Sequence, residues 1–125
     1  MSKTRNITGW VLTGLLFALL LMSGIMKILS SGNPDSEVFK SFIKLGLEGK
    51  IILIAAGELA SAILFLIPKT SSLGTLLLSS HLGGAIATHM EHGEAYFPVV
   101  VILLLMWVTS YLRNPEMLSS FKRKL

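Results

Sequence analysis

The chain has 125 residues, of which 52% are hydrophobic and 14% are charged, and its mean hydropathy is +0.70. A soluble domain carries about a quarter charged residues to solvate its surface, so this composition argues against disorder and against an ordinary soluble domain. The net charge of +4 forms no basic stripe with stacking aromatics, which argues against a nucleic-acid partner. No cysteine is present, which excludes disulfides, thiolate catalysis, thiolate-held Fe–S clusters and Cys-type zinc sites.

Four apolar runs, each nearly free of charge, are long enough for membrane helices, because a bilayer core needs about 20 residues of helix. We place the spans at about 7–29, 51–67, 72–90 and 95–112, within one integral membrane domain at 1–125. The buried helices of a soluble protein would join segments with a polar face, which these runs lack. The sequence therefore predicts an all-α fold, a four-helix transmembrane bundle in the lipid bilayer.

The first run follows Lys3 and Arg5, so a cleaved signal peptide is the alternative to a retained span. The uncharged run is longer than the apolar core of a usual signal peptide, and Lys27 interrupts it before the small residues at 30–32. Both features favour a retained span. Lys27 is then either a functional group or a lysine whose ammonium reaches the membrane interface.

The first loop is predicted to hold a short amphipathic helix. Asn33 before Pro34 is a helix-start signal, and Gly46 ends the pattern. One face of the helix is apolar and consists of Val38, Phe39, Phe42 and Ile43. This helix should lie on the outer membrane face or cap the bundle.

The second and third runs are joined by residues 68–72, which are so few that the two helices must form an antiparallel hairpin. Glu58 and His81 are almost equally far from this turn along the chain, so each should lie about 17 Å from it, near the membrane midplane. Ionisable groups there cost roughly 2.5 to 3.5 kcal/mol and are functional candidates. We predict that Glu58 and His81 form a catalytic pair. The structural alternative is a protonated Glu58 and a neutral His81 that only join helices.

A polar rim is predicted nearer the outer end of the bundle. Thr88 and His89 share a helix face with His81, at the level expected for Lys27 and Glu94. We predict ligand binding by four residues of this rim, which also includes His92: Lys27, Thr88, His89 and Glu94. His89 and His92 are spaced like some metal ligands, but with Glu91 or Glu94 they complete no recognised site, so no metal site is expected.

Small residues beside the polar groups predict close helix packing, which in membranes depends on small side chains. The glycines concerned are Gly57, Gly83 and Gly84. Basic residues set the orientation, because cytoplasmic flanks carry the excess of Lys and Arg. The side of the termini carries more of them, namely Lys3, Arg5, Lys69, Arg113, Lys122, Arg123 and Lys124, against Lys27, Lys40, Lys44 and Lys50 on the other. Both termini are therefore predicted to be cytoplasmic.

Several stretches have a familiar order and spacing: Ser-Gly-Ile-Met-Lys at 23–27, Gly-Glu-Leu at 57–59, Leu-Ile-Pro-Lys-Thr at 66–70, Gly-Gly-Ala-Ile-Ala-Thr-His at 83–89, Gly-Glu at 93–94 and Arg-Asn-Pro at 113–115. Together they resemble the DoxX-like family of small bacterial membrane proteins. The resemblance implies a four-helix protein of the bacterial cytoplasmic (inner) membrane. Some members of the broader DoxX and DoxD group are associated with quinone-linked oxidation of sulfur compounds, and others with redox-stress membrane complexes. Residue by residue, the resemblance points to Lys27, Glu58, Thr88, His89 and Glu94.

Three functions compete at this point. The first is a quinone-linked component of a membrane oxidoreductase, in which Glu58 and His81 relay protons, quinone is the cofactor and a partner supplies the electrons. The second is a non-catalytic protein that holds a small apolar ligand, a membrane partner or a second copy of itself. The third is transport of a small solute or protons, which is less favoured because four helices enclose a narrow pathway.

Overall fold

The computed structural model describes residues 3–122, and every regular element in that range is helical. The long helices are α1 (Lys3–Ser30), α3 (Ile51–Leu66), α4 (Ser71–Glu91) and α5 (Phe97–Arg113). Shorter elements are α2 (Glu37–Lys44), η1 (Pro68–Thr70) and η2 (Pro115–Lys122). The prediction of an all-α fold is confirmed.

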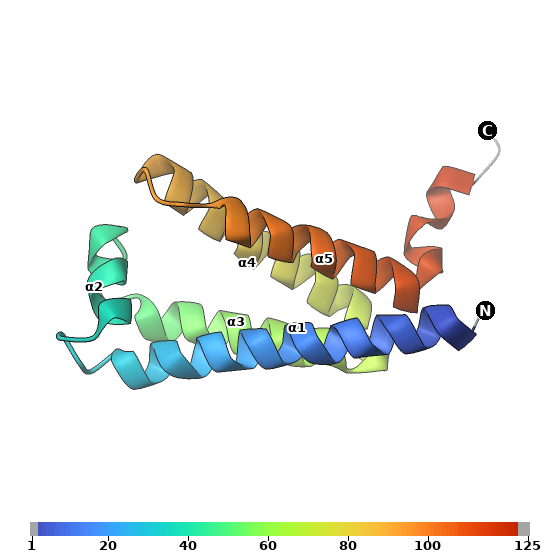
Figure 1. The fold of residues 1–125 in the computed structure, drawn as a ribbon, viewed down its shortest axis with the longest axis horizontal. Helices are drawn as coiled ribbons and strands as arrows, with labels where there is room; N and C mark the ends of the chain where they lie inside the picture. Colours follow the sequence, from blue (N-terminus) through green and yellow to red (C-terminus); the bar gives the residue numbers. More distant parts are fainter. Residues whose placement is uncertain (1–2, 123–125) are drawn as a thin grey trace.

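The four long helices form a closed ring, because α1 packs against α3 and α5, and α4 packs against the same two helices. In Figure 1, α1 and α3 run together as one pair, and α4 and α5 form a second pair that is tilted away from it. The pairs meet at the end where α1 begins and α5 ends, and they diverge toward α2. The chain bends by 110° between Ile51–Leu66 and Pro68–Glu91, which is the predicted hairpin in an open form.

The core lies toward the closed end and includes Phe65, Leu78 and Met106, all fully buried. Gly74 allows a close helix approach at this end, and Gly24 allows one in the half of α1 nearer α2. A Cβ on Gly74 would collide with the backbone of Phe65, and one on Gly24 would lie 2.5 Å from Leu59 Cδ2. Because only a hydrogen fits in these positions, Gly74 and Gly24 set the distances of α4 and α1 from α3.

The glycines predicted to make close helix contacts are not the ones that do so. Built Cβ atoms at Gly57, Gly83 and Gly84 meet nothing within 4 Å. The prediction was wrong because a cluster of small residues permits close approach on its face but does not determine which face meets a neighbour.

Arg113 at the end of α5 holds the closed end together. Its guanidinium donates to Phe65 O at 2.7 Å and to Leu66 O at 3.2 Å, two carbonyls of the last turn of α3 that have no partner within the helix. The same group lies 4.3 Å from the centre of the Trp10 ring of α1, a cation–π distance. One side chain thus joins α1, α3 and α5.

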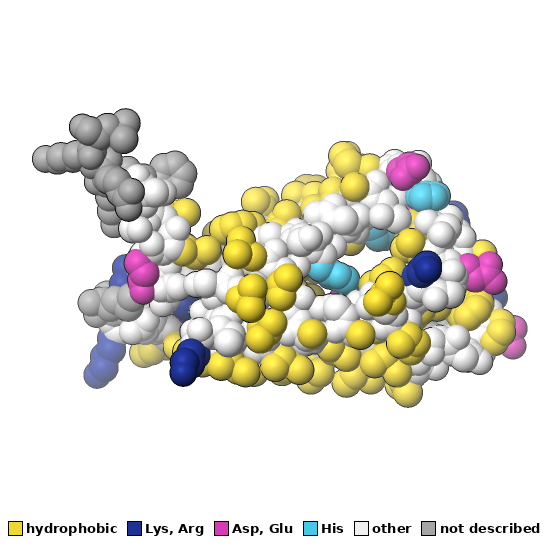
Figure 2. All heavy atoms as spheres, turned by 180° about the vertical axis from the view of Figure 1, so that it is seen from behind, with side chains coloured by type: hydrophobic (Ala, Val, Ile, Leu, Met, Phe, Trp, Pro, Cys, Tyr) yellow, Lys and Arg dark blue, Asp and Glu magenta, His cyan; other side chains and the backbone are white. Residues whose placement is uncertain are grey.

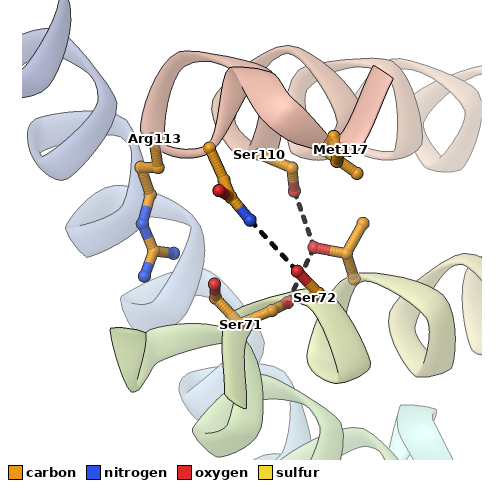
Figure 3. A pocket seen from close by; sticks show the side chains of 7 residues that line it. Ser71, Ser72, Ser110, Arg113 and Met117 are labelled. Carbon is orange, nitrogen blue, oxygen red and sulfur yellow. Dashed lines mark hydrogen bonds between the residues drawn. The ribbon is translucent and has the colours of Figure 1, made fainter. Parts of the chain in front are cut away.

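A small polar cluster between α4 and α5 completes this end (Figure 3). Thr75 Oγ1 and Ser110 Oγ are 2.8 Å apart, and the side chains of Ser72 and Asn114 are 3.1 Å apart. The hollow beside them leaves no room for a water molecule. We therefore interpret the cluster as a structural contact between helices.

The structure supports the predicted spans unequally. Within residues 3–122, α1 is the one helix that is long and apolar enough to cross a membrane by itself, and α3 with η1 and α4 passes the same test only as a bent pair. α3 has 16 residues and α5 has 17, so at about 1.5 Å per residue both fall short of a bilayer core about 30 Å thick. α4 is long enough, but its polar residues lower its hydropathy.

The amphipathic helix of the first loop is present as α2 and lies across the outer end of the bundle (Figure 1). Phe42 of α2 is buried, and so is Leu45, the residue that follows the helix. The predicted start at Asn33 was wrong: Ser36 is the cap and accepts from Phe39 N, while Asn33 Oδ1 accepts from Asp35 N in the preceding turn. Both residue types cap helices, so the sequence did not distinguish them.

Two residues used for the orientation, Arg123 and Lys124, lie outside the described residues. The described parts of the two chain ends lie on the same side of the bundle, because α1 begins at the end where α5 ends (Figure 1).

Candidate functional site

Three ionisable side chains meet in the interior. Glu58 Oε2 accepts hydrogen bonds from Lys27 Nζ at 2.7 Å and from His81 Nε2 at 3.1 Å. The Glu58 side chain is 4% exposed, and those of Lys27 and His81 are 18% exposed. An ionised carboxylate only accepts, so His81 Nε2 must carry its hydrogen toward Glu58. Glu58 and His81 thus lie together, as the depth comparison predicts, and their catalytic role stays a prediction.

The ammonium of Lys27 lies further inward than the outer rim in which this residue was predicted. It reaches Glu58 and also donates to Ser23 Oγ at 2.9 Å. A helical side chain points toward the helix N-terminus, so the long lysine side chain extends about one turn inward, past Ser23.

The second oxygen of Glu58, Oε1, is buried and has no hydrogen-bond partner within residues 3–120. An unpaired buried acceptor costs about 1 to 3 kcal/mol, and more when it is charged. The carboxylate therefore uses one oxygen to hold Lys27 and His81 and retains capacity on the other. This second oxygen is therefore open to a hydrogen bond from a water molecule or from a ligand.

A cavity of about 350 Å³ adjoins this cluster. It lies between the two helix pairs, where they diverge, and α2 covers its outer end. Its polar lining residues are Lys27, Ser41, Ser80, His81, Thr88 and His89, and its apolar ones are Phe42, Leu45, Leu47, Ile54, Gly84 and Ala85. We call this space the central cavity.

The predicted rim residues divide between two places. Thr88 and His89 line the central cavity, with Thr88 Oγ1 donating to Gly84 O at 2.8 Å and His89 Nδ1 buried without a partner in the described range. Glu94 lies apart from the cavity lining and accepts from Lys44 of α2 at 2.7 Å. His92 Nδ1 is 2.9 Å from Thr88 O, in its own helix.

A comparison with known protein families finds a match over most of the chain: the model of the DoxX-like family matches residues 11–110. The chain belongs to the DoxX-like family. The matched range includes all six candidate residues, from Lys27 to Glu94. Among curated proteins and among solved structures, none matches this chain significantly.

This DoxX-like protein is membrane-associated, since the family is and α1 contains an apolar stretch of 18 residues. The apolar window of α1 is only 22% buried, so most of its hydrophobic surface faces outward. Among the described residues, no group of three or more His, Cys, Asp or Glu side chains could hold a metal ion.

Some residues of the central cavity were not predicted from the sequence of this DoxX-like chain. Phe42, Leu45 and Leu47 reach it from α2 and the turn after it, and Ile54 reaches it from α3. The apolar face of α2 was a usable signal, because an amphipathic helix covers something. No pattern linked Lys44 to Glu94, since their contact depends on how two loops fold back.

The ion pair between Lys44 and Glu94 fastens α2 to the α4–α5 connection and should make this fastening depend on pH. The hydrogen bond with Lys44 and its charge lower the pKa of Glu94 below 4.5, and the hydrogen bond with Glu94 raises the pKa of Lys44 above 10.5. The contact therefore contributes fully between these values. It is lost as the pH falls through the lowered pKa of Glu94, or rises through the raised pKa of Lys44.

We expect hydrogen exchange of the α2 amides, corrected for intrinsic rates, to speed up at most about fivefold between pH 6 and pH 3, because exposed ion pairs are weak. Glu94→Gln should show the faster exchange at both pH values. Glu91→Gln is the matched control, because Glu91 is an exposed acid nearby with no ion pair in the described range. If exchange in Glu94→Gln equals that of Glu91→Gln at pH 6, the pair does not hold α2.

Proposed function

We propose that this DoxX-like protein is a multi-pass protein of the bacterial cytoplasmic membrane, with spans at about 7–29, 51–67, 72–90 and 95–112 and both termini in the cytoplasm. The support comes from exposed apolar side chains on every long helix, far from any core: Leu15, Leu53, Leu76 and Leu104 are 59% to 69% exposed. Figure 2 shows hydrophobic side chains along the length of one face and most of its charged ones toward the two ends. Slightly short helices are accommodated by local thinning of the bilayer.

We infer that its function is to bind a quinone in the central cavity, as a component of a membrane oxidoreductase. The observation that carries the proposal is the composition of the cavity. Hydrogen-bond donors from Lys27 and His89, together with the imidazole of His81, share about 350 Å³ with aromatic and aliphatic side chains. A quinone has carbonyl acceptors on an apolar ring and tail, so the residues present fit it. A ligand pocket of this kind is apolar with a few well-placed polar groups.

The side chains have separate tasks in this proposal. A bound quinone would supply the capacity to take up two electrons and two protons. His81 can exchange a proton at Nδ1 while Nε2 stays bonded to Glu58. Lys27 pairs with Glu58 at 2.7 Å and fixes its position. The electrons come from a partner protein, since the 125 residues carry no cysteine to hold a metal–sulfur cluster.

The quinone proposal is tested by filling the cavity. Ala85 lines it, whereas Ala87 lies on the same helix, is exposed and does not line it. We expect protein extracted from its own membrane in lipid discs to carry quinone, detected by mass spectrometry. Ala85→Trp should reduce the bound quinone at least about tenfold, a loss of about 1.4 kcal/mol, and Ala87→Trp should not. Equal quinone in both variants, or none in the wild type, would count against the proposal.

A second candidate function, assembly with a membrane partner, is favoured by the open space beside Gly57 and Gly83. These positions could admit a helix of another subunit. Here Gly57→Leu or Gly83→Leu would abolish copurification of the partner, whereas Ala85→Trp would leave it intact. The quinone proposal predicts the opposite pattern: Ala85→Trp should reduce the bound quinone, whereas Gly57→Leu and Gly83→Leu should leave it unchanged.

A further inference from the structure

The central cavity is closed at both ends of the bundle. At its outer end, Phe42 and Leu45 are each 7% exposed beneath α2, and the ion pair of Lys44 with Glu94 holds α2 in place. At its inner end, α3 and α4 come together at the contact of Gly74 with Phe65, and the core residue Leu78 is fully buried. A molecule dissolved in water therefore meets helix α2 on one side and the packed core on the other.

The side between α3 and α4 is different. Ser80 and Gly84 line the cavity from α4 and are exposed, and Ile54 lines it from α3 and is half-buried. A Cβ built on Gly84 meets nothing within 4 Å. Figure 2, which views the molecule from the face of α3 and α4, shows a hollow at this level. We call the gap bounded by Ile54, Ser80 and Gly84 the side opening.

The surface around the side opening is apolar. Leu53 of α3 is 69% exposed, and Leu76 and Leu77 of α4 are 63% and 41% exposed. A patch of this kind faces lipid in a membrane bundle. The opening thus leads from the hydrocarbon region straight to the side chains of Lys27, His81 and His89.

We propose that the central cavity is loaded sideways from the bilayer through the side opening, and that Gly84 keeps this route open. The ligand class that follows is a lipid-dissolved molecule with a hydrogen-bond-accepting head. The identity of the head as a quinone rests on the proposed function, whereas the route does not. The absence of a side chain at Gly84 then determines access to the site, because any larger residue there would project into the gap.

The route can be tested without any quinone, because the chain has no cysteine and a single introduced thiol is unique. Ala85→Cys places the thiol in the cavity lining. In liposomes, it should react with an alkyl maleimide dissolved in the bilayer at least about tenfold faster than with a sulfonated maleimide kept in water, a barrier difference of about 1.4 kcal/mol. Adding Gly84→Leu should slow the bilayer reagent by a similar factor.

Two controls isolate the opening. Gly83→Leu changes the neighbouring glycine, whose Cβ would also meet nothing within 4 Å but which does not line the cavity, and it should leave the rate unchanged. Leu76→Cys, on the lipid-facing surface, should react equally in all backgrounds. The proposal is overturned if the sulfonated reagent matches the bilayer reagent at Ala85→Cys, if Gly84→Leu slows labelling no more than Gly83→Leu, or if only Leu76→Cys reacts. Loss of quinone binding with an intact route would overturn the proposed function alone.

Discussion

Replacing Gly74 with alanine is expected to destabilise the protein by about 3 kcal/mol or more, at the upper end of the range for overpacking. The added Cβ would collide with the backbone of Phe65 and lie 2.6 Å from Leu64 C. Backbone atoms cannot rotate away as a side chain can, and Arg113 fixes this turn through Phe65 O and Leu66 O. The helices α3 and α4 must therefore separate. Thermal unfolding in mild detergent, followed by circular dichroism, measures the loss.

The matched control is Gly83→Ala on the same helix. Nothing lies within 4 Å of the added methyl group there, so the change should stabilise α4 by about 0.5 to 1 kcal/mol, the helix-propensity difference between the two residues. Opposite signs for the two substitutions would show that packing at Gly74, not propensity, decides the result. A loss at Gly74 no larger than the change at Gly83 would contradict the close helix crossing.

The sequence was most informative where a short connection fixed the alignment of two helices. The turn at residues 68–72 left no freedom in how α3 and α4 pair, so the equal distances of Glu58 and His81 from it predicted their contact, which the structure has at 3.1 Å. The resemblance to the DoxX-like family, based on motifs spread from Ser23 to Pro115, was likewise confirmed over residues 11–110.

The sequence did not predict contacts that depend on the length of a side chain or on which faces of two helices pack together. Lys27 was placed by the level of its backbone, but its long side chain carries the charge inward to Glu58. Gly74 was not among the glycines predicted to pack closely, although it makes the closest helix contact. The pairing of Lys44 with Glu94 joins two loops, and no spacing along one helix encodes it.

Replacing Glu58 with glutamine is expected to cost about 3 to 5 kcal/mol, because it leaves the Lys27 ammonium in the interior without its counter-charge. Lys27→Met should also destabilise, since the carboxylate would keep only His81 as a partner. The double variant, Lys27→Met with Glu58→Gln, removes both charges and should lose less than the sum of the two single changes. The difference, about 2 to 3 kcal/mol, is the coupling energy of the pair. Unfolding by SDS in mixed micelles measures all four proteins.

The same cycle distinguishes a structural strut from a functional acid. Additive losses would mean that the 2.7 Å contact does not couple the two residues, contrary to the geometry. With coupling established, the double variant is the informative one for function, because it keeps the fold while removing the acid. If it binds quinone but no longer shows proton uptake linked to quinone reduction, the pair of Lys27 and Glu58 takes part in proton transfer. If both properties persist, Glu58 and Lys27 serve to join α1 to α3, and His81 alone remains as the proton-exchanging group.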